Sequence, residues 1–298
     1  MRTGIFLPAL VVWLLMAANV QAADERGTNH DTHPLSRAEI DSFLPLVCSK
    51  PSSTDHPEFI GPAYDCAAFI GYDGQEENGT GEVPNGTAPG SISLQAIVYG
   101  SFSATAEDEA YVTYFSSREA HSLNFGGGIL FKRTENRWQL VHWYPGGQMG
   151  QCIGLPGNAP QSLLCLDGYV GMGEVDSSVW VKHVPSMSEN PPFQDVSILK
   201  AQDDREAIAP GEPDSYPCKL GGPSHKAMLL KINDLERSEN SAEIAVSHIT
   251  YATAQDVQIA CAKRHFESVN TTDGVVHYVI ENGKITAKTA FDFANTDY

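Results

Sequence analysis

The chain has 298 residues, of which 42% are apolar, so it contains enough hydrophobic material for a core and is not globally disordered. It has 19 basic and 37 acidic residues and a formal net charge of −18. A surface of this sign repels nucleic-acid phosphates and anionic lipid. The charge therefore argues against nucleic acid as a partner and favours solubility or a basic partner.

The first 22 residues have the pattern of a secretory signal peptide. Arg2 supplies a positive charge, an apolar run spans residues 5–18, and Val20-Gln21-Ala22 ends in small residues. The run is too short for a membrane span, so we expect residues 1–22 to be removed and the mature chain to have no transmembrane segment. We expect periplasmic or extracellular localisation, a flexible segment over residues 23–34 and a single domain over residues 35–298.

Six cysteines follow the predicted cleavage site, where an oxidising compartment allows disulfides. No Cys-x-x-Cys motif and no zinc-ligand spacing is present, which favours structural disulfides over a metal site. Neighbour-to-neighbour pairing would close two short segments and one longer one. This pairing joins Cys48 to Cys66, Cys152 to Cys165 and Cys218 to Cys261.

One helix is predicted near the start of the mature chain. Ser36 and Glu39 form a capping-box pattern, and Ile40, Phe43 and Val47 follow helical spacing. Pro45 should stop or kink this helix at the preceding residue.

From residue 91 onward the chain has the composition of an all-β protein. Short runs rich in β-branched and aromatic residues alternate with turn sequences, and no second helical pattern is evident. Glu281-Asn282-Gly283-Lys284 predicts a tight hairpin. The predicted strands are 92–102, 110–115, 128–132, 138–143, 163–166, 179–184, 193–200, 226–232, 243–250, 275–280 and 285–293.

Trp138, Trp143 and Tyr144 form the densest aromatic group of the chain. Strict alternation along one strand would place the two tryptophans on opposite faces, with Tyr144 on the face of Trp138. Such residues more often fill a core than bind a ligand.

Two segments resemble each other: 99–112 and 232–246. Each runs from a strand through a polar loop to an acidic residue, which is followed by an apolar strand. They also resemble the FG-GAP or VCBS repeat of integrin-like β-propellers, in which a Gly-Asp-Phe-Asn-Gly-Asp-Gly loop precedes Asp-Leu-x-Val. The resemblance implies repeated antiparallel sheets arranged as in a propeller. A β-sandwich is the alternative, because about a dozen strands make fewer blades than a closed propeller has.

In the family that these segments resemble, the loop acids bind calcium. The first copy has Ser101, Ser103 and Thr105 in place of acidic or amide residues, and neutral hydroxyls are poor calcium ligands. The second copy keeps its acids, so it is the candidate metal site if calcium is bound at all; otherwise no cofactor is expected. The candidate ligands are Asp234, Glu236, Glu239 and Glu243.

No catalytic motif identifies an enzyme, and we assign no catalytic residue. There is no G-x-S-x-G, P-loop, Rossmann fingerprint or H-E-x-x-H sequence. Our first hypothesis is an exported, non-enzymatic β domain that binds a protein or glycan. The alternative is a secreted hydrolase whose site is assembled only in the fold, from scattered histidines and acids. The histidines considered are His121, His142, His183, His248, His265 and His277.

Overall fold

The computed structural model describes residues 31–55, 59, 61–72, 89–103, 108–117, 126–145, 150–155, 161–171, 174–183, 196–203, 226–263, 269–290 and 293. The predicted signal peptide, residues 23–30 and Cys218 lie outside the described residues. Within the described ranges, no helix combines the length and the apolar character needed to cross a membrane.

Three antiparallel sheets make up most of the described chain, as expected for an all-β protein. The first sheet contains β1 (His33–Pro34), β3 (Ser52–Thr54), β4 (Ala63–Cys66), β6 (Gly90–Gly100), β7 (Glu109–Ser116), β8 (Gly126–Thr134) and β9 (Arg137–Pro145). The second contains β10 (Cys152–Gly154), β11 (Ser162–Gly171), β12 (Glu174–His183) and β13 (Val196–Asp203). The third contains β14 (Met228–Ile232), β15 (Glu236–Arg237), β16 (Ala245–Ala252), β17 (Thr272–Glu281) and β18 (Lys284–Lys288). A separate short pair joins β2 (Cys48–Ser49) to β5 (Ala68–Phe69).

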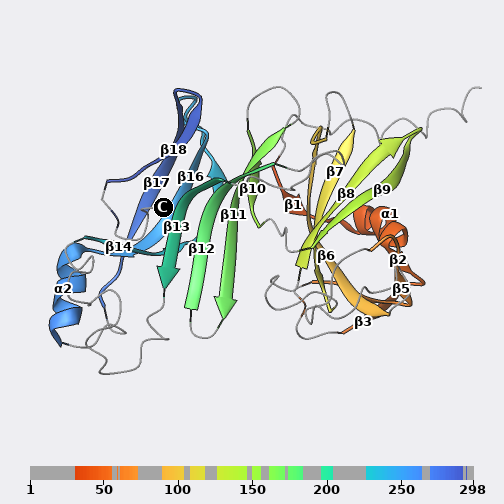
Figure 1. Cartoon of the computed structure of the whole chain (residues 1–298), viewed down its shortest axis with the longest axis horizontal. Coiled ribbons are helices and arrows are strands. Elements are labelled where there is room, and N and C mark those ends of the chain that lie inside the picture. The colour runs from red at the N-terminus through yellow and green to blue at the C-terminus, as the bar shows by residue number, and fades with distance from the viewer. Residues whose placement is uncertain are drawn as a thin grey trace, which may run out of the picture.

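The three sheets follow one another in chain order along the long axis of the molecule (Figure 1). Because side chains alternate along a strand, neighbouring residues enter different cores. Tyr111 packs between the first and second sheets, whereas Val112 packs on the opposite face of the first sheet. Leu163 of β11 faces the first sheet, and the adjacent Leu164 faces the third. The second sheet is therefore covered on both faces.

A helix lies at each end of the row of sheets (Figure 1). α1 (Arg37–Val47) has the predicted capping box and buries Phe43 and Val47 against the first sheet. Of the two effects predicted for Pro45, a stop or a kink, the stop is wrong, since the helix continues to Val47. Pro45 lies in the last turn, where burial of Val47 and the disulfide of Cys48 offset the one lost backbone hydrogen bond.

The prediction of a single helix is also wrong. α2 (Ala254–Lys263) follows β16 and covers one end of the third sheet, where Val257 and Ala260 pack against Met228. Its start carries a signal that sequence reasoning missed: the Asp256 backbone N–H donates to Thr253 Oγ1 at 3.2 Å. Thr-x-x-Asp is a weaker form of the capping box, and the helix has few apolar residues.

A β-bulge corrects the predicted faces of the two tryptophans. Leu130 pairs with His142, but Phe131 pairs with Leu140, so β9 contains one extra residue between them. The extra residue shifts the alternation, and both Trp138 and Trp143 pack on the α1 side of the sheet. Tyr144 instead faces the second sheet.

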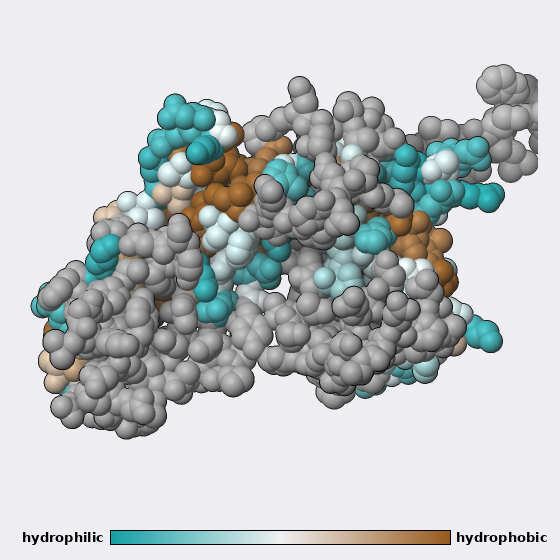
Figure 2. All heavy atoms as spheres, viewed as in Figure 1, coloured by the Kyte–Doolittle hydropathy of each residue, from teal (hydrophilic) through white to brown (hydrophobic). Residues whose placement is uncertain are grey.

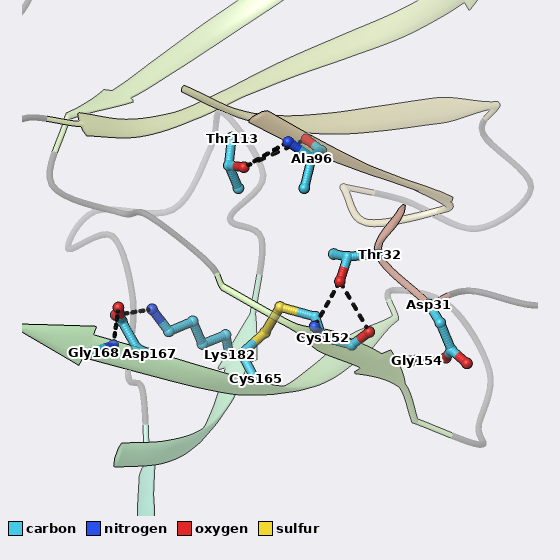
Figure 3. The surroundings of a disulfide bond; sticks show 10 residues. All are labelled: Asp31, Thr32, Ala96, Thr113, Cys152, Gly154, Cys165, Asp167, Gly168 and Lys182. Atoms are coloured by element: carbon cyan, nitrogen blue, oxygen red, sulfur yellow. Dashed lines mark hydrogen bonds and ion pairs between the residues drawn. A yellow bond between two sulfur atoms is a disulfide. The ribbon is translucent and has the colours of Figure 1, made fainter. Parts of the chain in front are cut away.

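Residues 31–34 are bound to the sheets, although a flexible segment was predicted up to residue 34. His33 and Pro34 pair with β6, and Thr32 Oγ1 accepts a 2.7 Å hydrogen bond from the Cys152 backbone N–H. Figure 3 shows Thr32 beside the disulfide between Cys152 and Cys165. The segment thus lies at the junction of the first and second sheets.

Two of the predicted disulfides are confirmed, Cys48–Cys66 and Cys152–Cys165. Cys261 on α2 is disulfide-bonded as well, while its predicted partner Cys218 lies outside the described residues. The predicted Asn282-Gly283 turn is also confirmed, with φ values of 53° and 74°.

Candidate functional site: the outer face of the third sheet

Beyond α2, the outer face of the third sheet is open to solvent and carries two histidines on adjacent strands. His248 on β16 lies opposite Val275, and His277 on β17 lies opposite Val246. Paired residues and residues two apart share a face, so all four point outward. The alternate positions, such as Val276 and Tyr278, are fully buried in the core against the second sheet. We call this surface the histidine face.

A carboxylate from the loop between β14 and β15 holds the first histidine. Asp234 Oδ1 accepts the backbone N–H of His248 at 2.8 Å, and Oδ2 lies 3.0 Å from Nδ1 of the same residue. An ionised carboxylate can only accept, so Nδ1 is the protonated nitrogen in this contact. The Asp234 side chain is 28% exposed and that of His248 54% exposed.

A second carboxylate, at the end of the connection to β16, holds the other histidine. Glu243 Oε2 lies 3.0 Å from Nδ1 of His277 and also accepts from Ser238 Oγ at 3.0 Å. Asn240 Nδ2 donates to the other carboxylate oxygen at 3.1 Å. The hydrogen bond from His277 lowers the pKa of Glu243 below 4.5, with further bonds from Ser238 and Asn240 in the same direction. Glu243 is therefore held in its ionised form at neutral pH.

Polar contacts continue along the same face toward α2. Thr250 Oγ1 donates to Asp273 Oδ1 at 3.2 Å and accepts from Asn233 Nδ2 at 3.1 Å. The histidine face also includes Lys231, opposite Thr250, and Val275, whose residue surface is 41% exposed. It thus combines fixed donors and acceptors with a single exposed apolar side chain.

The arrangement limits what the histidines can do chemically. A carboxylate on Nδ1 fixes the tautomer and ring orientation and leaves the Nε2 lone pair as the reactive position. Such a nitrogen can accept a proton, accept a hydrogen bond from a partner or ligate a metal ion. In the sequence His248 and His277 are two of several scattered histidines; the strand register is what places them on adjacent strands of one face.

The four predicted calcium ligands do not converge on one point. Asp234 contacts His248 and Glu243 contacts His277, whereas Glu236 and Glu239 are exposed. Within the described ranges, no group of three or more His, Cys, Asp or Glu residues is arranged to hold a metal ion. Calcium binding by this loop stays a prediction.

In the first of the two similar segments, Glu109 forms hydrogen bonds within the loop that precedes it. Glu109 is 1% exposed, and its carboxylate accepts the backbone N–H groups of Phe102 and Ser103 at 2.6 and 2.8 Å. Its other oxygen accepts from Ser103 Oγ, as Glu243 accepts from Ser238 Oγ. In both segments an acid thus accepts a hydrogen bond from a serine earlier in its own loop, six residues earlier for Glu109 and five for Glu243.

One further pair bears on the hydrolase alternative. Ser162 and His183 lie opposite each other on β11 and β12, with Oγ 2.6 Å from Nδ1. Serine hydrolases hold a serine hydroxyl at this distance from a histidine ring nitrogen, but from Nε2, whereas the contact here is to Nδ1. His142 lies elsewhere, packed edge-on against Tyr144. His121 and His265 lie outside the described residues.

Apolar surface is exposed where the second and third sheets spread apart. Val196 on β13 is 54% exposed and Ile280 at the end of β17 is 49% exposed. Figure 2 also shows hydrophobic surface in the region of the second and third sheets, next to the hydrophilic tip of the β17–β18 hairpin.

The sequence matches no protein-family model, and neither a curated protein nor a solved structure matches it. The assignment of function therefore depends on the geometry of the described residues.

Proposed function

We propose that this protein acts outside the cytoplasm as a non-enzymatic binding domain, and that it binds a protein partner through the histidine face. Three observations support the location: the two disulfides, the further disulfide-bonded Cys261, and the signal-peptide pattern of residues 1–22. Disulfides of this kind persist in oxidising compartments.

The observation that carries the proposal is the contrast between the two ends of the stack. The outer face of the first sheet is covered by α1, whereas α2 covers only one end of the third sheet. The rest of that face displays ordered polar side chains around the exposed Val275. Ordering these groups in advance lowers the entropic cost of binding.

A protein partner fits this face better than a glycan. Its outward residues carry charges of both signs, such as Lys231, Asp273 and the ion pair between Lys288 and Glu281. No Trp, Tyr or Phe is among its outward positions on the described strands β16–β18, so a sugar ring would find no aromatic platform there.

We also infer that the three sheets are repeated units of the propeller type. Each contains a four-stranded antiparallel meander, and the two similar segments both connect the first strand of a meander to the next, β6 to β7 and β14 to β16. The matching Glu109–Ser103 and Glu243–Ser238 contacts support this inference.

The binding proposal is tested by crosslinking in the native compartment. A photo-reactive residue at Val275 should form a specific adduct with a partner, while the same residue at Ile70, which is equally exposed at 41% on the far end of the molecule, should not. The Val275→Arg variant should lose the partner and keep its thermal unfolding midpoint. Equal adducts at both positions would contradict the proposal. An adduct with a glycan would show that the partner is a glycan and not a protein.

The hydrolase alternative is supported by one observation, the contact between Ser162 and His183. An activated serine reacts with fluorophosphonate probes. If the alternative is correct, the wild-type chain is labelled and the Ser162→Ala variant is not. Absence of label on a folded wild-type chain would remove the alternative.

A further inference from the structure

We propose that His248 and His277 together bind a single divalent transition-metal ion of the Zn²⁺, Ni²⁺ or Cu²⁺ class through their Nε2 atoms. The site goes beyond the proposed partner binding and does not depend on it. It differs also from the predicted calcium site, because the ligands are imidazole nitrogens and not carboxylates.

The positions of the two residues carry the first step. They lie on adjacent strands and on one face of the sheet, and they are offset by two residues from being directly opposite, since His248 is paired with Val275 and His277 with Val246. Diagonal neighbours of this kind have Cβ atoms within about 8 Å, which long side chains can span. Both side chains are about half exposed, so an ion can reach them.

The carboxylates carry the second step. Asp234 lies in the loop that follows β14, and β14 pairs with β16 on the side away from β17. Glu243 precedes β16, beyond Val246 and away from His248. Each acid therefore bonds Nδ1 of its histidine from the side that faces away from the other histidine. This arrangement turns the opposite edges, which carry Nε2, toward the space between the histidines.

The chemistry of the ligands selects the class of metal. Imidazole nitrogen suits Zn²⁺, Cu²⁺ and Ni²⁺, whereas Ca²⁺ and Mg²⁺ prefer oxygen. A carboxylate on the second nitrogen is the usual partner of a metal-binding histidine and raises the basicity of the ligating nitrogen. Two protein ligands leave positions on the ion for water or for a group of a binding partner.

Calorimetric titration of the tag-free mature chain with ZnCl₂ tests the proposal. We expect one ion per chain, with at least a tenfold loss of affinity in His248→Ala and in His277→Ala. Asp234→Asn and Glu243→Gln, which alter positioning residues, should weaken binding by about tenfold while both nitrogens remain. Affinity should fall from pH 7.5 to pH 5.5 because protons compete for imidazole.

Matched controls separate this site from other histidines. His33→Ala on β1 and His142→Ala on β9 should leave zinc affinity unchanged. CaCl₂ should give no heat at this site. The proposal is overturned if the folded wild-type chain binds no zinc at millimolar concentration, or if binding survives both histidine substitutions. Because zinc binding is measured without a partner, its failure is distinguishable from a failure of the crosslinking test.

Discussion

Asp31 and Arg237 form a bidentate ion pair, although they are 206 residues apart in the chain. Arg237 Nη2 lies 2.6 Å from Asp31 Oδ1, and Arg237 Nε lies 3.0 Å from Oδ2. The same guanidinium donates to the Gly154 carbonyl at 3.0 Å. One side chain of the third sheet is thus bonded to both the N-terminal segment and the second sheet, and with Thr32 and His33 this segment connects all three sheets.

The Arg237→Lys variant should lower the free energy of unfolding by about 1 kcal/mol. Lysine keeps the charge but loses the planar fork that bonds both carboxylate oxygens. The pair is partly exposed, with side chains 43% and 20% accessible, so solvent screening limits the effect. Urea denaturation measures the change. Arg37→Lys, in the more exposed pair with Asp41, is the control and should shift stability by no more than about 0.5 kcal/mol.

Removing the disulfide of the second sheet should cost roughly 3 kcal/mol, since it closes a loop with a sequence separation of 13 residues. The variant is Cys152→Ala with Cys165→Ala, measured by urea denaturation. Thr32 bonds the backbone of Cys152, so amide exchange at the N-terminal segment should also accelerate. A loss below 1 kcal/mol would show that the sheet contacts alone hold β10 in place.

Peptide mapping under non-reducing conditions should recover three linked pairs. Cys48–Cys66 and Cys152–Cys165 follow from the structure, and Cys218–Cys261 stays the sequence-based prediction. A peptide joining Cys261 to any other cysteine would show that this third pairing is wrong.

Stability should fall at acidic pH in part through Glu39. Burial opposes ionisation of this carboxyl, but hydrogen bonds from Ser36, Tyr99 and His33 outweigh it and hold its pKa below 4.5 in the folded chain. The ionised form therefore stabilises the fold above pH 4.5, and that contribution is lost as the pH falls through the folded-state pKa.

The Glu39→Gln variant measures this contribution. We expect a loss of about 0.5–1 kcal/mol at pH 7 that shrinks toward zero below pH 4. Ser36→Ala removes the hydrogen bond between the Ser36 hydroxyl and the Glu39 carboxylate. It should therefore also make the free energy of unfolding depend less on pH. A constant difference between wild type and Glu39→Gln from pH 3 to pH 7 would contradict the assignment.

Calcium gives a separate test of the loop acids. If Asp234 and Glu243 stay bonded to His248 and His277 and take no calcium, the thermal unfolding midpoint should be the same in CaCl₂ and in chelator. A ligand that binds only the folded state raises the midpoint with concentration. A rise of several degrees in CaCl₂ that disappears in Asp234→Asn would instead support the predicted calcium site.

Sequence reasoning succeeded where the physical cause is local. The capping box of Ser36 and Glu39 and the Asn282-Gly283 turn depend on residues within one turn of chain. It failed where a distant contact overrides a local preference. Pro45 did not end α1, because burial of Val47 and the disulfide at Cys48 lie just beyond it.

The candidate site illustrates the same division. Strand alternation indicates that Val246 and His248 share a face, but no local signal says that His277 lies across from Val246. Likewise, the extra residue of β9 that brings Trp138 and Trp143 to one side arises from pairing with β8. Register is set by how whole strands pack, and a shift of one residue reverses every face.

The amino-acid sequence by itself determined the β-rich composition, the positions of most strands, the first helix and the two confirmed cysteine pairings, because propensity, capping and short loop closure act over neighbouring residues. Only the tertiary structure decided the order in which the sheets stack, the second helix, the anchoring of Asp31 by Arg237 and the pairing of His248 and His277 with their carboxylates. These contacts join segments up to 206 residues apart, and their geometry exists only once the strands have paired and the cores have formed.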